Sequence, residues 1–401
     1  MSFKKDFPIF KNNPWLVFLD SASSSQKPEI VINGVKDLFE NNYANIHRWV
    51  YDLSQESESI YQNSKEKVKN LINAKSKKEI IYTYNSTYAC NIITQSLWKS
   101  GKLKKWDKVL LSVSEHHANI VPWLMLKEEV WIEVEFIDID ENFTIDIEDF
   151  DKKYDEKVKV VSLTYVSNVL WWINDLKSIS KKLREDTYFI IDWSQSVPHF
   201  KTDVSDLNCD FMFFTWHKIL ADTWIWVLYW KEDLLRELKA PISWGWAISL
   251  VSKESYKEAE LPEKFEAWTP NISGACSLLK AIEYIESIWW YSAIEKHENE
   301  LIEYTLKKFS ELKWIKLYGS PRSENRIWVF SFSVEWVHHS DVSDFLAEEN
   351  ICIRSWKHCT EPLMDYYWEI WSNRMSLYIY NSKEDIDKFF DALKKCIELY
   401  S

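Results

Sequence analysis

The sequence predicts an α/β protein with a mostly parallel sheet and a smaller C-terminal α+β domain. Between about residues 80 and 230, apolar runs rich in β-branched and aromatic residues alternate with stretches of helical periodicity. That alternation is typical of βαβ units, which build parallel sheets covered by helices. After about residue 285 the pattern changes to a long charged helix, two further strands and a final amphipathic helix. A chain of 401 residues is long enough for more than one domain.

The elements follow in chain order. Strands are expected over residues 79–84, 107–113, 131–138, 158–166, 187–192, 211–215 and 225–230, with helices at 89–100 and 176–186 between them. The later part is expected to hold a helix over 291–312, strands over 326–334 and 374–380, and a helix over 384–399. We therefore predict a large domain over 20–285 and a small domain over 286–401, which the N-terminal segment 1–19 joins.

Charge and cysteine content exclude several classes of function. The net charge of −13 argues against binding to nucleic acid or to an anionic membrane surface. Residues 1–14 lack the apolar core of a secretory signal, and no apolar run approaches the roughly 18 residues that span a bilayer. The six cysteines form neither a CxxC pair nor a disulfide framework. We expect a cytoplasmic protein that has no nucleic acid, membrane or structural metal as a partner.

Tryptophan and glycine occur in abnormal proportions. The chain has 24 Trp and 5 Gly, whereas a glycine share of about 7% would give roughly 28 glycines. Glycine is the residue that turns and close backbone approaches require. Several tryptophans stand at such places: Trp106, Trp171–Trp172, Trp224, Trp226, Trp244, Trp246 and Trp289–Trp290. Our hypothesis is that the gene uses UGA for glycine, so that most of these letters stand for glycine, whereas Trp123 is a true tryptophan.

Two charged residues follow neighbouring predicted strands. Asp192 ends the strand 187–192, and Lys218 comes three residues after the strand 211–215. Ligands of open α/β sheets bind outside the carboxyl ends of the strands. Burial there favours the neutral, nucleophilic amine of a lysine, and an aspartate can pair with a pyridinium nitrogen, as in enzymes that use pyridoxal 5′-phosphate (PLP). From these residues alone, a helix cap for Asp192 and a surface charge for Lys218 stay open.

Several separated segments then carry a resemblance that runs nearly from end to end. They are LDSAS (19–23), NIHRWVYDLS (45–54), SEHHANIVPW (114–123), YVSNVLW (165–171), IDWSQSVPH (191–199), TWHK (215–218), FEAWTPN (265–271) and RSWKHCTEPLM (354–364). In this order they resemble the group II (SUF-system) cysteine desulfurases of the class V aminotransferase family. The resemblance implies the PLP-dependent transferase fold of type I.

The resemblance also implies roles around the cofactor. Lys218 would bind PLP covalently, Asp192 would keep the pyridine nitrogen protonated, Gln195 would bind the ring hydroxyl oxygen, and His116 would stack on the ring and take part in catalysis. A metal site at Glu115, His116 and His117 is the alternative. It is geometrically awkward, because adjacent residues of a strand point to opposite faces.

Further residues would hold the phosphate and the substrate. The resemblance assigns the phosphate to Ser86, Thr87, Thr215 and His217 and, across a homodimer interface, to Thr269 of the other subunit. Asn168 would lie beside the cofactor and substrate, and Arg374 would bind the substrate carboxylate. Two departures from the family pattern, Tyr88 and the pair Ala221–Asp222, affect the loop around the phosphate.

Cys359 is the expected sulfur acceptor. Arg354, Lys357 and His358 lie within five residues of it, and cationic neighbours favour the thiolate form of a cysteine. The implied activity converts L-cysteine to L-alanine, leaves a persulfide on Cys359 and supplies a sulfur-acceptor protein of the SUF system for iron–sulfur cluster assembly. Three alternatives stay open: a selenocysteine lyase, another PLP enzyme of this fold in which Cys359 is structural, and a non-catalytic aromatic-rich binding protein.

Overall fold

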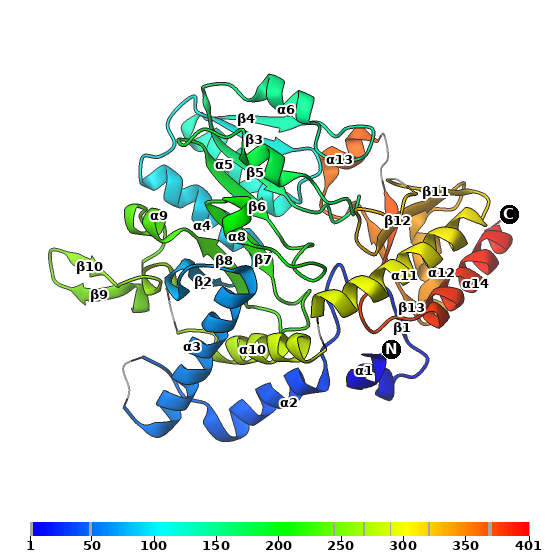
Figure 1. The fold of residues 1–401 in the computed structure, drawn as a ribbon, viewed down its shortest axis with the longest axis horizontal. Coiled ribbons are helices and arrows are strands. Elements are labelled where there is room, and N and C mark those ends of the chain that lie inside the picture. The colour runs from blue at the N-terminus through cyan, green and yellow to red at the C-terminus, as the bar shows by residue number, and fades with distance from the viewer. Residues whose placement is uncertain are drawn as a thin grey trace.

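The computed structural model describes residues 3–47, 50–243, 245–267, 269–288, 290–319, 321–367 and 371–400. The predicted turn positions Trp244 and Trp289 lie outside these ranges. The chain forms a large sheet with helices on both faces, and a smaller sheet lies beside it, built mainly by the C-terminal part (Figure 1). The α/β fold class is confirmed.

In the described part of the chain, the large sheet has seven strands in the order β2-β8-β7-β6-β5-β3-β4. They are β2 (Ile80–Thr83), β3 (Lys108–Ser112), β4 (Glu133–Ile137), β5 (Val158–Thr164), β6 (Tyr188–Asp192), β7 (Phe211–Thr215) and β8 (Trp226–Trp230). All seven predicted strands are confirmed. β8 alone among them runs antiparallel to both neighbours. The ten residues 216–225 that join β7 to β8 are too few for the crossover that a parallel pair needs.

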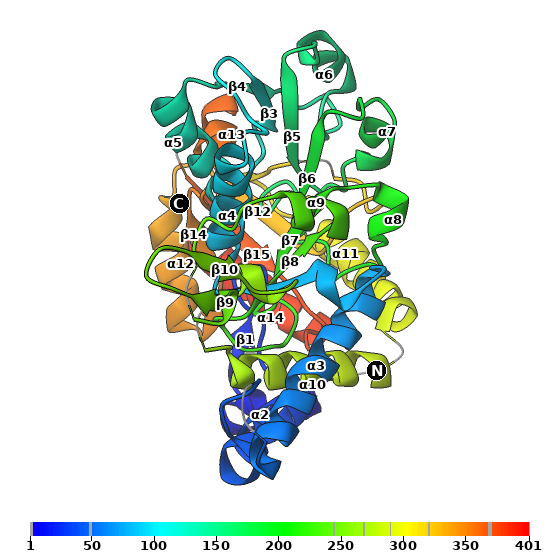
Figure 2. The ribbon, with the colours of Figure 1, turned by 90° about the vertical axis from the view of Figure 1, so that its left-hand side faces the viewer.

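The strands other than the edge strand β4 are almost wholly buried on both faces, which explains their continuous apolar character. In β3, Val109 and Leu111 pack into the core beneath α4 and α5, whereas Leu110 faces the opposite core. Figure 2 shows α4 and α5 on one side of β5 and β6, and α7 and α8 on the other. The side-chain alternation of a strand therefore fixes which residues meet which layer of helices.

The four predicted helices lie close to their predicted positions, with one exception, and the other helices had not been predicted. α1 (Pro8–Asn12) lies in the N-terminal segment, and the helices of the large part are α2 (Glu29–Asp37), α3 (Asp52–Ile72), α4 (Ser86–Lys99), α5 (Val121–Val130), α6 (Ile147–Lys153), α7 (Leu176–Ser180), α8 (Val204–Leu207), α9 (Glu232–Glu237) and α10 (Ile272–Ser287). The prediction of a helix over 176–186 is too long, because α7 ends at Ser180. Arg184 binds elsewhere: its backbone N–H donates to Tyr154 Oη (2.8 Å) and its guanidinium to the carbonyl of Val158 (2.7 Å).

The smaller sheet is antiparallel and has the order β11-β12-β15-β14. Its strands are β11 (Ile315–Leu317), β12 (Val329–Val334), β14 (Arg354–Trp356) and β15 (Ser372–Ser376), and its helices are α11 (Trp290–Ser310), α12 (His339–Glu348), α13 (Glu361–Tyr366) and α14 (Lys383–Tyr400). β1 (Val17–Phe18) pairs in parallel with β13 (Ile351–Cys352), so the N-terminal segment lies against the C-terminal part. The division at residue 285 stays a prediction.

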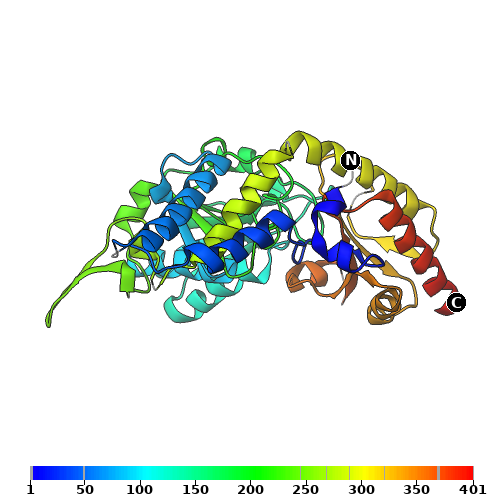
Figure 3. The ribbon, with the colours of Figure 1, turned by 90° about the horizontal axis from the view of Figure 1, so that it is seen from below.

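A hairpin of β9 (Ile248–Val251) and β10 (Tyr256–Glu258) projects from the large part, and Figure 3 shows it reaching away from the rest of the molecule. Its apolar side chains are exposed, Leu250 by 64% and Val251 by 70%. Within the described ranges, every helix is too short or too polar to cross a membrane.

Candidate active site

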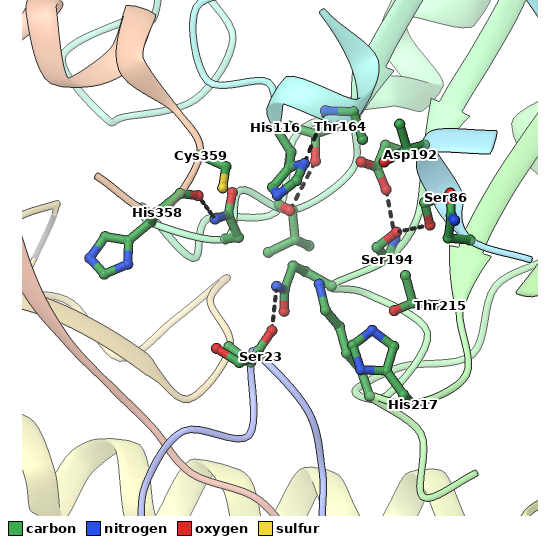
Figure 4. A pocket seen from close by; sticks show the side chains of 18 of the residues that line it. Ser23, Ser86, His116, Thr164, Asp192, Ser194, Thr215, His217, His358 and Cys359 are labelled. Atoms are coloured by element: carbon green, nitrogen blue, oxygen red, sulfur yellow. Dashed lines mark hydrogen bonds between the residues drawn. The ribbon is translucent and has the colours of Figure 1, made fainter. Parts of the chain in front are cut away.

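A cavity of about 220 Å³ opens at the carboxyl ends of β5, β6 and β7, whose last residues Thr164, Asp192 and Thr215 all line it. Of the twelve predicted site residues, all of which the structure describes, eleven line this cavity: Ser86, Thr87, His116, Asn168, Asp192, Gln195, Thr215, His217, Lys218, Cys359 and Arg374. Figure 4 labels Ser86, His116, Asp192, Thr215, His217 and Cys359 among them. Thr269 does not; it is exposed and lines a separate cavity of about 40 Å³. Their meeting follows from the rule that ligands bind where parallel strands end.

Lys218 and Asp192 are two ionisable residues that line the cavity. Asp192 is buried, and its Oδ1 accepts a hydrogen bond from the Ser194 backbone N–H (2.9 Å). Burial raises the pKa of Asp192. Burial also lowers the pKa of the Lys218 amine to about 8, against the attraction of Asp192 and with the help of Arg374 and Arg354. A neutral, nucleophilic amine is thus accessible near neutral pH.

His116 is a neutral ring on the cavity wall. Burial lowers its pKa to about 3, and the Lys218 charge acts in the same direction. Its Nδ1 accepts a hydrogen bond from the Ala118 backbone N–H (3.1 Å), so the ring proton sits on Nε2. The alternative metal cluster does not form, because Glu115 binds Ser112 and other buried groups while His117 pairs with Glu361. Within the described residues, no other group of histidine, cysteine and carboxylate side chains could hold a metal.

The opposite wall suits an anion. α4 begins at Ser86, so the free backbone N–H groups and the positive end of the helix dipole face this part of the cavity. Asn85 caps the helix by accepting a hydrogen bond from the Tyr88 N–H (2.6 Å). The buried Thr215 Oγ1 has no hydrogen-bond partner among the described residues, and such a group normally has one. Burial also lowers the pKa of His217 to about 3.

These walls fit pyridoxal 5′-phosphate. The helix N-terminus and the unpartnered Thr215 hydroxyl suit its phosphate, and the buried Asp192 carboxylate suits a pyridinium N–H. Gln195 lines the same space, and its Nε2 donates to the carbonyl of Ala22 (3.1 Å).

Two arginines converge on the small-sheet side. Arg374, on β15, donates to Ser23 Oγ (2.8 Å), Asp20 Oδ1 (3.3 Å) and the carbonyl of Asn168 (3.2 Å). Arg354, on β14, donates to the same Ser23 Oγ (3.0 Å). The buried Arg374 Nε has no partner among the described residues. Two guanidinium groups beside one carboxylate leave a net positive site that can accept a second carboxylate.

Cys359 lies on a tight loop between β14 and α13. His358 and Cys359 both have left-handed backbone angles, with φ of 53° and 58°, which is uncommon for residues with side chains. The loop is fastened to the large part by two hydrogen bonds, from Asn168 Nδ2 to the carbonyl of His358 (2.8 Å) and from the His117 N–H to the carbonyl of Cys359 (2.9 Å). The Cys359 side chain remains partly exposed and lines the cavity.

The expectation that His358 supplies positive charge near Cys359 is wrong. His358 is buried, and burial together with Arg374 and Arg354 holds its pKa well below the ordinary value. The positive charge at this loop therefore comes from Arg354, Arg374 and Lys357, whose ammonium group lies 4.0 Å from Glu361 Oε1, rather than from the histidine.

Five further residues line the cavity that the sequence did not assign to the site: Ser23, Asn85, Thr164, Val166 and Ser194. Ser23, Val166 and Ser194 lie within the segments that carry the resemblance, and Asn85 directly precedes Ser86, so membership of those segments was the available signal. Thr164 and Ser194 reach the cavity because β5 and β6 end there, which strand boundaries alone do not resolve.

Comparison with known proteins agrees with this geometry. The family model "Aminotransferase class-V" matches residues 17–389. A probable cysteine desulfurase of Synechocystis is 36% identical over 99% of this chain and 96% of its own length, and one of Halalkalibacterium halodurans is 37% identical over 99% and 98%. The chain belongs to the cysteine desulfurases of the class V aminotransferase family. The resemblance found in the motifs is thereby confirmed at the level of the family.

Solved structures of the family superpose over nearly the whole chain. The apo cysteine desulfurase of Thermococcus onnurineus is 32% identical, with a TM-score of 0.91 over 99% of this chain and 97% of its own. The cysteine desulfurase CsdA of Escherichia coli, in an S-sulfonic acid form, is 28% identical, with a TM-score of 0.90 over 100% and 98%. A C-DES mutant with glycine covalently linked to its PLP cofactor shares the fold, at 17% identity and a TM-score of 0.83.

Proposed function

We propose that this chain is a PLP-dependent cysteine desulfurase of the group II, SUF-system type, which converts L-cysteine to L-alanine and passes the sulfur through Cys359. The observation that carries the proposal is one cavity that brings together a lysine of lowered pKa, a buried aspartate, an arginine pair and a partly exposed cysteine. These groups come from both the large and the small sheet.

Each residue has a task that its surroundings support. Lys218 would hold the cofactor through its amine, and the Asp192 carboxylate would accept a hydrogen bond from the pyridinium N–H and so keep that nitrogen protonated. The α4 N-terminus, Thr215 and His217 would bind the phosphate. When bound, PLP supplies an electron sink for negative charge that develops at the substrate Cα.

The substrate side of the cavity is provided by the small sheet. Arg374, with Arg354 beside it, would bind the carboxylate of L-cysteine, which turns the substrate sulfur toward the Cys359 loop. The neutral Lys218 amine is suited to take a proton from Cα and to return it. The Cys359 thiolate would attack the substrate sulfur: a sulfur–sulfur bond forms, the bond from sulfur to Cβ breaks, and alanine leaves after Cβ gains a proton.

The test is alanine production from L-cysteine by the purified chain. We expect the Cys359→Ser variant to lose sulfur transfer while its PLP absorbance stays unchanged. Cys352→Ser, a change at another partly exposed cysteine seven residues away, should keep full activity. Equal rates in the Cys359→Ser variant would assign the chain to another reaction of this fold. Faster release of selenium from L-selenocysteine than of sulfur from L-cysteine would make it a selenocysteine lyase.

The homodimer, the SUF acceptor and the cytoplasmic location belong to the same proposal. Thr269 is exposed and lies outside the cavity of its own subunit, which is consistent with a contact to the phosphate in a second copy. Sedimentation should give a dimer, and Thr269→Val should weaken PLP binding without changing the cavity of its own chain. A monomeric chain, together with unchanged PLP affinity in the Thr269→Val variant, would contradict an active site shared between two subunits.

A further inference from the structure

Tryptophan occupies backbone conformations that suit glycine. Among the described residues, fifteen residues other than glycine have a left-handed φ, and six of them are tryptophan: Trp106, Trp131, Trp171, Trp224, Trp314 and Trp336, with φ between 54° and 73°. A bulky residue at such a φ is an outlier, whereas glycine adopts it freely. Four of the remaining nine are asparagine, which tolerates this region. Six indoles among fifteen are far more than chance allows for 24 tryptophans in 401 residues.

At five of these positions the side chain is exposed and the backbone carries the structural contacts, whereas the Trp171 indole is buried in a core cluster. Trp131 ends α5 in the left-handed conformation, and its N–H donates to the carbonyl of Lys127, the arrangement in which glycine ends helices. The Trp106 N–H donates to the carbonyl of Trp131 (3.0 Å). Trp106, Trp131 and Trp224 are 54%, 60% and 66% exposed, so their indoles fill no core.

The buried tryptophans raise a second conflict, at the indole N–H. Among the described residues, eight buried indole nitrogens lack a hydrogen-bond partner: those of Trp123, Trp171, Trp172, Trp193, Trp216, Trp226, Trp230 and Trp328. Buried donors are normally satisfied. Since Trp123 belongs to this set, the N–H alone does not separate true tryptophans from glycines. Trp123 differs in position, because it lies within α5 at a helical φ and packs between α4 and the sheet.

Two of these residues are sequence neighbours of the proposed cofactor residues, and a third lines the cavity. Trp193 directly follows Asp192, and Trp216 directly precedes His217 and Lys218. Trp226 lines the cavity and lies with its ring 5.2 Å from that of His217. The cavity of about 220 Å³ is smaller than the roughly 300–1,000 Å³ of ordinary ligand pockets. Glycine at position 226 would free space beside the phosphate-binding wall.

We infer that the protein made in its own cells carries glycine at the six left-handed tryptophans and at 193, 216 and 226, and tryptophan at 123. The genetic basis would be a UGA codon read as glycine at those positions and the ordinary UGG codon at 123. The working cavity would then be wider than the printed sequence allows. At the six left-handed positions this inference rests on backbone geometry, and at 193, 216 and 226 it rests on composition and on the place of these residues beside the cofactor residues. It holds whichever reaction the cavity performs.

Peptide mass spectrometry of the protein isolated from its own cells is the direct test. We expect the residue mass of glycine at positions 106, 131, 171, 193, 216, 224, 226, 314 and 336, and that of tryptophan at 123. Tryptophan at the left-handed positions would overturn the inference.

Recombinant variants of the chain as printed give a second, independent readout. Trp224→Gly should leave the melting temperature unchanged or raise it, because the residue is exposed and left-handed. Trp98→Gly, a matched change within α4, should lower it. Trp226→Gly should tighten PLP binding at least tenfold, whereas Trp123→Gly should lower the melting temperature without that gain. A Trp224→Gly variant that loses as much stability as Trp98→Gly would contradict the inference.

Discussion

The lowered pKa of Lys218 makes a quantitative prediction about cofactor loading. A fall from the ordinary value of 10.5 to about 8 raises the neutral fraction of the amine at pH 7 about 300-fold. Since the neutral amine is the nucleophile, the rate at which PLP attaches to the cofactor-free chain should rise with pH and level off above about 8. Stopped-flow measurement of the visible absorbance of the bound cofactor gives this profile.

The profile should respond to the charges around Lys218 in opposite directions. Asp192 raises the pKa of Lys218, so Asp192→Asn should move the midpoint of the profile below 8. Arg354 lowers that pKa, so Arg354→Gln should move the midpoint up. A midpoint near 10.5 in the unmodified chain, or an upward shift in the Asp192→Asn variant, would refute the reasoning that burial sets the reactivity of this amine.

Three further predictions follow from the described contacts. His116, His217 and His358 are neutral in the fold, because their pKa values are lowered. The free energy of unfolding of the cofactor-free chain should therefore fall as the pH drops below about 6.5, by up to about 1.4 kcal/mol per pH unit for each histidine. An unfolding free energy, measured with urea, that stays constant between pH 6.5 and 4.5 would contradict this. Arg374→Gln should raise the KM for L-cysteine by about 10- to 100-fold, since a charge-assisted hydrogen bond to the substrate carboxylate contributes about 1.5–3 kcal/mol. An unchanged KM would show that Arg374 does not bind the substrate carboxylate. Lys65→Met should lower the free energy of unfolding by about 3–5 kcal/mol, because the buried Glu266 carboxylate loses its ion pair, in which the Lys65 Nζ lies 2.8 Å from Glu266 Oε1. The double variant Lys65→Met/Glu266→Gln should regain part of the lost melting temperature.

The sequence predicted the large sheet well, because its strands are short apolar runs separated by helical stretches. Strand direction was less accessible. Periodicity reports which residues are buried but not which way a strand runs, so the reversal of β8 appeared only in the structure. The early end of α7 likewise depends on Arg184 binding the carbonyl of Val158, the first residue of β5, which is a tertiary contact that no local propensity contains.

For the site, strand ends and motifs located Lys218, Asp192 and the Cys359 loop. Sequence could not show that Ser23 and Arg354, which are 331 positions apart, meet in one hydrogen bond; that contact follows from the pairing of β1 with β13 and of Asp20 with Ser376. Nor could it show that His358 is neutral, because its charge state is set by burial and by Arg374 rather than by its sequence neighbours.

The most direct measurement locates the sulfur after one turnover. The PLP-loaded chain is mixed with L-cysteine, its thiols and persulfides are trapped with an alkylating reagent, and the peptides are analysed by mass spectrometry. We expect one additional sulfur atom on Cys359, none on the other five cysteines, and an equal amount of alanine. Alanine formed without sulfur on Cys359, or sulfur found first on another cysteine, would contradict it.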